Sequence, residues 1–405
     1  MDKKIIFLYN IRNVLIAYRS TILQQFQEPF NSITMANKPS TKPTCRTTNK
    51  STAKVEQAQP EKKSSYAIAG VDIDSKMEGI KTIKKMVATT KTKGSIGGIG
   101  NFGGLFQSPG ADSLLVGSAD GVGTKLKVAC IAKKHNTVGE DLVNHCVNDI
   151  LVQGAEPLFF MDYVGASQFN GPVFTEIVEG LVRGCKQNGC ALLGGETAEL
   201  PGVYPQGEYD LVGTIVGVVK KNKIITGEKI KPGDVIIGLA SGGLQTNGYS
   251  LARRVIFDVC GLTVNDYLPG TRTRIGDALL ATHRSFLKPV KAVMAKMPIN
   301  GMAHITGGGF VDNIPRVLPA RCRAVINRLS WKVPQIFQFI EKTGKVDHDE
   351  MYRVFNMGIG FVLIIDKAKA QKAFDILKAA KAQPSIIGYI EKASEKGVVY
   401  RDEEV

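Results

Sequence analysis

The chain has 405 residues, of which 43% are hydrophobic, and its formal net charge is +15. This length suits two or three domains with sizeable cores, and the apolar content is that of a globular protein. Residues 1–64 carry 11 Lys/Arg and only 4 Asp/Glu, and no dense basic run follows them, so the charge does not indicate a nucleic-acid partner.

The seven cysteines form no C-x-x-C pair, and their number is odd. This argues against a zinc ribbon and a disulfide scaffold, and it favours a reducing compartment. The apolar stretches at residues 5–11 and 13–18 are separated by Arg12, and neither approaches the roughly 20 residues of a membrane span. We therefore expect a cytoplasmic protein that does not enter a membrane.

Residues 1–64 are basic, rich in Ser and Thr, and poor in acidic residues. Three interpretations stay open: a transit peptide for a plastid or mitochondrion, a disordered extension, or a misassigned start with Met35 as the true start. Residues 36–64 have almost no bulky apolar side chains, which predicts disorder. The predicted organisation is a disordered basic extension over 1–64, an N-terminal domain over 65–220 and a C-terminal α/β domain over 221–400.

The first predicted domain combines a glycine-dense loop with strands and helices. Six of the eleven residues in Gly94–Gly104 are Gly, which disfavours a regular helix or strand. Apolar spacing then predicts a strand at Leu114–Val116, a helix over Val138–Gln153, a helix from Pro172 to near Gly189, and a strand at Leu211–Val219.

A polar run at residues 220–223 marks the predicted domain boundary. The second domain is predicted to contain a strand at Val235–Ala240, a helix at Tyr249–Val259, a strand at Ile359–Ile365 and a helix at Lys369–Ala382. Strands and helices interleave in both halves, so each half is predicted to be mixed α/β.

The sequence Ser118-Ala119-Asp120-Gly121-Val122-Gly123-Thr124-Lys125 could form a phosphate and metal site. Gly121 and Gly123 would let backbone N–H groups approach an anion, and Thr124 and Lys125 could contact phosphate. Asp120 offers a hard oxygen for Mg²⁺. The spacing is not that of a Walker A loop, and an ordinary strand–turn–helix corner remains the alternative.

Further carboxylates could complete a metal site. Asp149 lies on an otherwise apolar helix, where a carboxylate is paired, exposed to solvent or bound to metal. With Asp120 it could share one Mg²⁺. Glu196 and Glu199 follow two glycines and could bind metal or substrate hydroxyls, or simply face solvent.

Two later loops suit anions. Residues 241–250 are rich in Gly and lead into a predicted helix, and Gly307, Gly308 and Gly309 precede another. His304 could transfer a proton, although an isolated His is more often structural. Anion loops in both halves predict two phosphorylated ligands, a nucleotide and a phosphorylated substrate.

With these motifs the chain resembles the aminoimidazole ribonucleotide synthetases, also called phosphoribosylformylglycinamidine cyclo-ligases. The resemblance runs from about Tyr66 to Gly388. The pattern from Asp149 to Pro157 is also found in formylglycinamidine ribonucleotide amidotransferase, selenophosphate synthetase and thiamine-phosphate kinase. The matching stretches are Ala69–Asp74, Gly97–Phe106, Asp120–Leu126, Val147–Phe160, Gly194–Gly202, Thr246–Ser250, Ala303–Phe310, Asn313–Val317 and Glu350–Gly360.

The resemblance implies two mixed α/β domains, with the N-terminal halves of two subunits pairing into a β-barrel as a homodimer. It implies ATP and Mg²⁺ as cofactors and formylglycinamidine ribonucleotide as the substrate. ATP would phosphorylate the formyl amide oxygen, and the amidine nitrogen would then attack that carbon and expel phosphate.

The resemblance also implies roles for individual residues. Those implied for ATP are Gly98, Gly100, Asp120, Gly121, Gly123, Thr124, Asn148 and Asp149. Those implied for the metal are Asp120, Asp149 and Glu199. Those implied for the substrate are Glu196, Asn247, Gly248, Thr306, Gly307, Gly308 and Gly309. Those implied for catalysis are Lys125 and His304.

The chain departs from the family pattern at three positions. Ala67 stands where the family usually has Lys, Ala119 where it commonly has Thr, and Gln245 where it commonly has His. Two other interpretations therefore stay open: a sister ATP-dependent phosphotransferase of a small metabolite, and an inactive ATP-binding paralogue.

Overall fold

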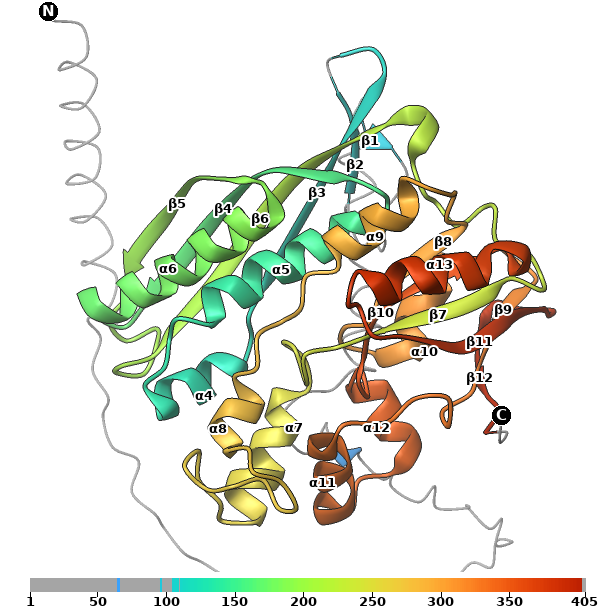
Figure 1. Cartoon of the computed structure of the whole chain (residues 1–405). Helices are drawn as coiled ribbons and strands as arrows, with labels where there is room; N and C mark the ends of the chain where they lie inside the picture. The colour runs from blue at the N-terminus through green and yellow to red at the C-terminus, as the bar shows by residue number, and fades with distance from the viewer. Residues whose placement is uncertain (1–63, 66–94, 97–103, 109, 403–405) are drawn as a thin grey trace, which may run out of the picture. The chain divides into compact units, whose positions relative to one another are not determined.

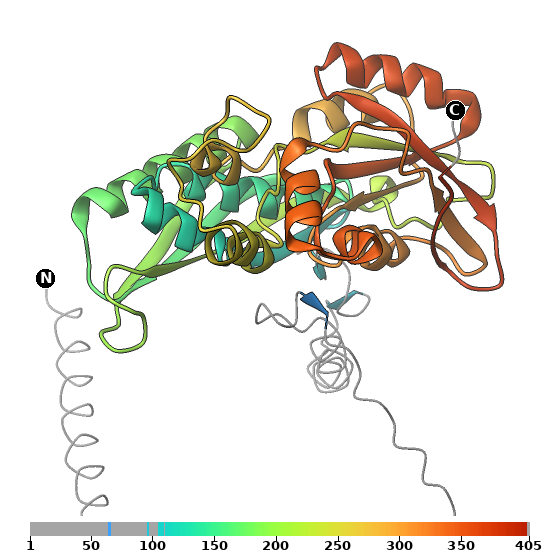
Figure 2. The same ribbon diagram turned by 90° about the horizontal axis from the view of Figure 1, so that it is seen from below.

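The computed structural model describes residues 64–65, 95–96, 104–108 and 110–402. These residues belong to one compact unit that spans Glu61–Val405. Their strands form two six-stranded sheets, one from each predicted half (Figure 1). Figure 2 shows the teal and green elements of the first sheet on one side and the orange and red elements of the second on the other. The prediction of mixed α/β structure in both halves is confirmed.

The first sheet has the strand order β1-β2-β3-β6-β4-β5. Its neighbours pair antiparallel except β4 and β5, which are parallel. The strands are β1 (Ser95–Ile96), β2 (Gly104–Gln107), β3 (Ser113–Gly121), β4 (Glu156–Ala166), β5 (Ala191–Glu199) and β6 (Tyr209–Lys220).

Helices α5 (Val138–Leu151) and α6 (Gly171–Asn188) pack together on one face of this sheet (Figure 1). Leu114 and Val116 of β3 are buried on that face, and the side chains that alternate with them point to the other. Helix α6 starts as predicted, with the Asn170 side chain accepting from Val173 N–H, and ends at Gly189 with φ +71°. The shorter helix α4 (Lys125–Ala132) follows β3.

The second sheet has the order β12-β9-β11-β7-β10-β8, with all seven residues of β10 buried in its interior. Only β9 and β12 pair in parallel. The strands are β7 (Val235–Ala240), β8 (Gly301–His304), β9 (Cys322–Ile326), β10 (Ile359–Ile365), β11 (Pro384–Lys392) and β12 (Gly397–Tyr400).

The helices of the second half are mostly short. They are α7 (Tyr249–Arg253), α8 (Ile275–Leu279), α9 (Leu287–Met294), α10 (Gly309–Asn313), α11 (Gln335–Gly344), α12 (His348–Val354) and α13 (Lys367–Ala379). A π-helical turn, Arg254–Val259, continues α7, and 3-10 turns lie at Lys221–Lys223 and Ile314–Arg316. Of the two long helices predicted here, α13 is confirmed with shifted ends, whereas Tyr249–Val259 is α-helical only in its first half.

The strands predicted at residues 235–240 and 359–365 match β7 and β10 residue for residue. Within the glycine-dense loop, Ser95–Ile96 pairs with β2 and forms a short strand, contrary to the prediction for that stretch. Predictions on residues 1–63, on Ala67 and on Gly98 and Gly100 lie outside the described residues. Within the part of the chain that the structure describes, every helix is too short or too polar to cross a bilayer.

Candidate active site

Three of the motif loops meet beside the first sheet. Thr124, after β3, lies with its Oγ1 3.2 Å from Ser250 Oγ at the start of α7. A Cβ added to Gly307 would lie 3.3 Å from Nδ2 of Asn247. The phosphate-loop candidate of the first half therefore contacts the loop at residues 241–250, and that loop in turn contacts the loop at Gly307.

Beneath these loops lies a cluster of histidines. Three of the five histidines in the chain are buried with their ring centroids 5.1 Å apart pairwise: His145 of α5, His283 between α8 and α9, and His304 at the end of β8. Of these three, we expected a functional role from the sequence only for His304. His145 had a usable signal, because it precedes Asp149 by four residues on one helix face. His283 had none, because its neighbours are distant in sequence.

The two predicted metal-binding aspartates sit against this cluster. Asp120 Oδ2 lies 2.8 Å from His145 Nε2, which is also 3.8 Å from Asp149 Oδ2. The other Asp149 oxygen lies 2.8 Å from His304 Nδ1, and Ser118 Oγ donates to Asp149 Oδ2 at 3.1 Å. Asp120 is 44% exposed and Asp149 is buried, so Asp120 is the carboxylate open to a ligand.

The members of the cluster differ in their protonation, because each one shifts the pKa of its neighbours. Burial alone would raise the pKa of Asp120, but the adjacent His145 outweighs it and lowers this pKa to about 2. For His145, burial would lower the pKa, but Asp120 and Asp149 outweigh it and raise the pKa to about 9. Burial lowers the pKa of His304 more than Asp149 raises it. Near neutral pH the cluster thus holds a charged Asp120–His145 pair beside a neutral His304.

Each ring of the cluster is held at both nitrogens. Thr246 Oγ1 lies 2.7 Å from His145 Nδ1 and 3.3 Å from His283 Nδ1. The Nε2 atoms of His283 and His304 are 3.1 Å apart. Two contacts per imidazole fix its orientation, which a site for proton transfer or metal binding requires.

His145, Asp149 and His304 each offer a ligand atom within 4.8 Å of the others, so the cluster could hold a metal ion. The oxygens of Asp120 and Asp149 suit Mg²⁺, which takes hard oxygen ligands. The imidazole nitrogens are the donors that divalent transition metals prefer.

Lys125 does not face the phosphate-loop candidate. Its side chain is fully buried, with Nζ 2.8 Å from Asp141 Oδ2 and 2.8 Å from the backbone oxygen of Ala281. Burial lowers the pKa of Lys125, and Asp141 opposes that shift. This placement does not support a direct contact between Lys125 and phosphate. Lys125 is the first residue of α4, and its side chain points into the core rather than toward the glycine loop.

Asn148 is also occupied within the protein. Its Oδ1 accepts from Phe286 N–H at 2.9 Å, and its Nδ2 donates to Arg284 O at 2.8 Å and lies 3.2 Å from His283 Nε2. The side chain is fully buried, so its placement does not support the expected contact with ATP.

Glu196 and Glu199 lie away from the two aspartates, so their placement does not support the expectation that Glu199 shares a metal ion with them. Both glutamates are on β5, and β6 and β4 separate β5 from β3, so the gap is roughly 14 Å at about 4.8 Å per strand. Glu199 Oε1 instead accepts from Phe169 N–H at 2.6 Å. Within one chain, Glu199 cannot share an ion with Asp120 and Asp149.

The loop of Thr306 to Gly309 is tightly supported. Asn313 Nδ2 donates to Gly309 O at 2.7 Å, and Thr306 Oγ1 donates to Asn313 Oδ1 at 3.2 Å. Gly309 has φ +58°, and a Cβ there would collide with Tyr352 O, so only glycine fits. Gly248, in the facing loop, has φ +77° and abuts the Phe355 ring.

Gln245 occupies an unusual position for a polar residue. It is buried with φ +63°, a left-handed conformation that non-glycine residues seldom adopt. Neither its Nε2 nor its Oε1 has a hydrogen-bond partner among the described residues. Strained backbone conformations cluster at functional sites. An unpaired buried polar group in a native structure calls for an explanation, and a functional role is one of them.

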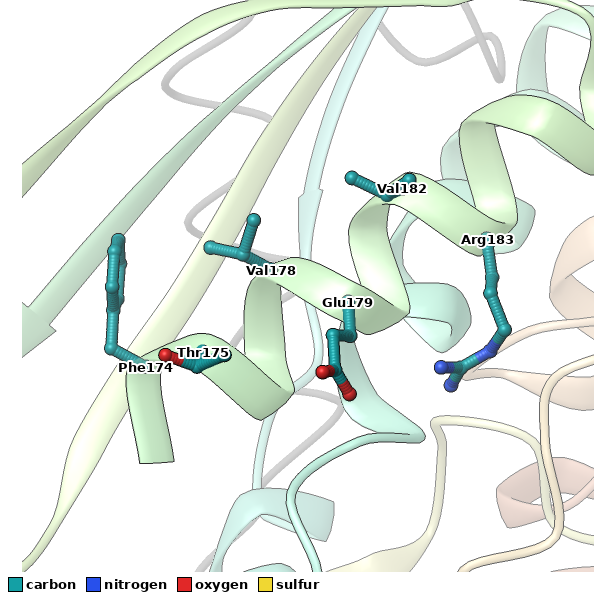
Figure 3. A pocket seen from close by; sticks show the side chains of 6 residues that line it. All are labelled: Phe174, Thr175, Val178, Glu179, Val182 and Arg183. Carbon is teal, nitrogen blue, oxygen red and sulfur yellow. The ribbon is translucent and has the colours of Figure 1, made fainter. Parts of the chain in front are cut away.

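A groove of about 450 Å³ runs along the exposed side of α6, away from the cluster. Figure 3 shows that all six of its lining side chains, among them Phe174, Val178 and Val182, project from that one helix. Among the described residues, no carboxylate or imidazole from another element lines this groove, so it does not compete with the histidine cluster as the candidate active site.

Two family models match the chain. The model described as AIR synthase related protein, N-terminal domain, matches residues 104–219, and the corresponding C-terminal domain model matches residues 231–401. The boundary between the two matches falls between the two sheets.

Curated proteins match over most of the chain. The phosphoribosylformylglycinamidine cyclo-ligase of Thermoanaerobacter sp. (strain X514) is 48% identical over 335 residues, which cover 82% of this chain and 99% of the relative. The protein of the same name from Syntrophus aciditrophicus is 48% identical over 83% of this chain and 98% of the relative. That of Alkaliphilus metalliredigens is 43% identical over the same shares.

Solved structures match the fold at low sequence identity. Thiamine monophosphate kinase from Aquifex aeolicus superposes with a TM-score of 0.55 at 15% identity, covering 83% of this chain and 99% of that one. Hydrogenase maturation protein HypE in complex with ATP gives a TM-score of 0.53 at 16% identity, covering 73% and 83% of the two chains.

Proposed function

Because the chain belongs to the AIR synthase family of phosphoribosylformylglycinamidine cyclo-ligases, we propose that it closes the imidazole ring of aminoimidazole ribonucleotide in purine biosynthesis. The substrates are formylglycinamidine ribonucleotide and ATP. The observation that carries this function is the 48% identity over nearly the whole length of cyclo-ligase relatives. The cluster of Asp120, Asp149 and His304 supports it with chemistry suited to ATP.

The reaction needs ATP because an amide oxygen is a poor leaving group. The formyl amide oxygen takes the γ-phosphoryl group of ATP, ADP departs, and the amide N–H proton is lost as the C–N double bond forms. The amidine nitrogen then bonds to the formyl carbon and loses its N–H proton, the carbon–oxygen bond breaks, and phosphate leaves and takes up one proton. Tautomerisation of the remaining imine to the amine completes the aromatic ring. One proton is released overall, and the protein's part is positioning, charge neutralisation and proton transfer.

Asp120 and Asp149 are the residues that we propose for Mg²⁺. When bound, the ion neutralises charge on the phosphates of ATP. The low pKa of Asp120, about 2, keeps its carboxylate anionic throughout the physiological range, as a cation site requires. Its partial exposure and its position at the end of β3 support a role at the interface between protein and nucleotide.

The glycine loops are proposed to hold the two phosphorylated ligands. Gly121, Gly123 and Thr124, together with Gly98 and Gly100, would hold the ATP phosphates. Asn247, Gly248 and Thr306–Gly309 would hold the substrate's ribose phosphate, with Glu196 as a further substrate contact. The 3.2 Å approach of Thr124 to Ser250 supports two adjoining sites, because it brings both sets of loops into contact.

His304 is proposed to move the proton that ring closure releases. Burial lowers its pKa, so its imidazole is neutral at pH 7 and able to accept a proton. The His304 ring is fully buried, with Asp149 on Nδ1 and His283 on Nε2, so a proton that it takes up must pass through one of these two neighbours.

We also propose a homodimer formed through the first sheet. On the face away from α5 and α6, that sheet leaves Phe106, Met161 and Leu193 exposed at 48%, 40% and 64%. Apolar side chains on an open sheet face are typical of a surface that a partner covers. Pairing of two such faces would close the sheets into the β-barrel that the family resemblance implies.

Genetic complementation tests the proposed function in cells. Expression of the chain should restore growth without purines to a bacterium that lacks its cyclo-ligase gene. Failure to rescue, with the protein present at normal levels, would contradict the assignment. Purified protein that releases ADP only with a different acceptor would instead support a sister phosphotransferase, and ATP binding without turnover would support an inactive paralogue.

A further inference from the structure

Residues 281–286, between α8 and α9, form neither helix nor strand, yet much of their backbone is hydrogen-bonded to side chains of α5. Asp141, Asn144 and Asn148 are spaced three and four residues apart, so they lie on one face of that helix. Asp141 Oδ1 accepts from His283 N–H at 2.6 Å, and Asn144 Nδ2 donates to His283 O at 2.8 Å. Asn148 bonds the backbone of Arg284 and Phe286.

A buried ion pair extends this contact at its N-terminal end. Lys125 and Asp141 are both fully buried, and Lys125 Nζ also donates to the backbone oxygen of Ala281. Burying two charges is costly unless each is paired and hydrogen-bonded. Here both charged groups also bond the 281–286 backbone, so the ion pair and the segment hold each other in place.

The backbone contacts of residues 281–286 place the His283 ring in the candidate active site. With its backbone N–H and C=O bonded to α5, the His283 ring lies 3.1 Å from His304 Nε2 and 3.2 Å from Asn148 Nδ2. His304 in turn contacts Asp149 at 2.8 Å. A continuous set of contacts therefore runs from the α5 face through the segment and His283 to His304.

We propose that Lys125, Asp141 and Asn144 form a clamp that joins the two halves of the chain and positions His283, and through it His304, for the reaction. They are positioning residues and need not contact either ligand. The inference rests on the proposed function, because turnover is one of its readouts. It also accounts for the burial of Lys125, a residue that the sequence motif alone would assign to phosphate.

Two matched double variants test the clamp. Lys125→Met/Asp141→Asn and Lys125→Met/Asp141→Leu both remove the two charges, so neither leaves a lone buried charge. Their side chains at position 141 are similar in size, but only Asn keeps an oxygen for His283 N–H. The two variants differ in that one hydrogen bond. Lys134→Met, which breaks the exposed Lys134–Asp277 pair just after α4, is the control.

The Leu variant should have a kcat about tenfold to a hundredfold below that of the Asn variant, with KM for ATP changed by less than about twofold. Hydrogen exchange of peptides that cover residues 281–286 should be about tenfold faster in the Leu variant. Lys134→Met should match the wild type in both measurements. If the Leu variant does not fold, Asn144→Ala gives the comparison. It keeps the ion pair and removes the donor to His283 O, together with the acceptor of Asn188 Nδ2, which retains its bond to Gly184 O.

Equal exchange in the two double variants would overturn the clamp, and so would faster exchange in the Leu variant without a fall in kcat. A wild-type protein without cyclo-ligase activity would instead contradict the proposed function. The exchange measurement does not depend on activity, so the two failures are distinguishable.

Discussion

At the residue scale, Asp120 makes the most specific prediction. Asp120→Asn removes the exposed anionic oxygen proposed for Mg²⁺ and the charged partner of His145. We expect ADP formation to fall at least about a hundredfold, because charge neutralisation at the transferring phosphoryl group is lost. A coupled ADP assay measures this loss, and an unchanged circular dichroism spectrum would show that the fold is intact. Turnover at the wild-type rate would remove Asp120 from the metal site.

His304 carries a second prediction at this scale. His304→Gln keeps a hydrogen-bonding side chain but cannot accept a proton in the same way, so kcat should fall by about 10² to 10⁴-fold at saturating substrates. The matched control is His348→Gln, because His348 is half exposed on α12 and lies outside the cluster. That variant should keep kcat within about twofold. Equal kcat values for the two variants would rule out proton transfer by His304.

Single residues also show where prediction from sequence stops. Asp120, Asp149 and His304 were recognisable because each lies beside glycines or on an otherwise apolar helix. An ionisable side chain at such a position indicates a functional role. Asp141 and His283 were not recognisable, because these two hydrogen-bonded residues lie 142 positions apart in the sequence and only the fold brings them together. For Lys125, the motif gives its neighbours in sequence but not the buried Asp141 that pairs with it.

At the scale of elements, the packing of α5 on α6 depends on small residues. A Cβ at Gly139 would collide with Ile177 O and lie 2.5 Å from Leu181 N. Gly139→Ala should therefore lower the free energy of unfolding by about 1–3 kcal/mol, despite the better helix propensity of Ala. Urea unfolding measures this change. Gly397→Ala is the control, because no described atom outside its own chain neighbours would lie within 4 Å of its Cβ, and it should change stability by less than about 0.5 kcal/mol. Equal stabilities of the two variants would contradict the close packing.

Elements with a clear period were predictable, and those without one were not. Helices α5 and α6 and strands β7 and β10 follow from apolar spacing and from Pro172 and Gly189 at the ends of α6. Strands β4 and β5 escaped prediction. Strand β5 contains Gly194, Gly195 and two carboxylates and is exposed along most of its length, so it lacks a buried apolar face. Its pairing with β4 is set by the sheet rather than by its own residues.

At the scale of the whole molecule, the exposed face of the first sheet predicts a dimer. Met161→Asp would place a carboxylate within the proposed interface, where an unpaired charge is costly. We expect the wild type to sediment as a dimer at micromolar concentration and the variant as a monomer in analytical ultracentrifugation. Glu179→Gln, on the exposed side of α6, should leave the dimer intact. A monomeric wild type would contradict this interface.

We propose that the chain couples ATP cleavage to ring closure, through ligand sites to which both of its halves contribute. The most direct measurement supplies the purified protein with formylglycinamidine ribonucleotide, ATP and Mg²⁺, and follows aminoimidazole ribonucleotide and ADP together. Both products should form in a one-to-one ratio, and neither product should form when either substrate is omitted. Protein that binds ATP but forms no aminoimidazole ribonucleotide under these conditions would contradict this proposal.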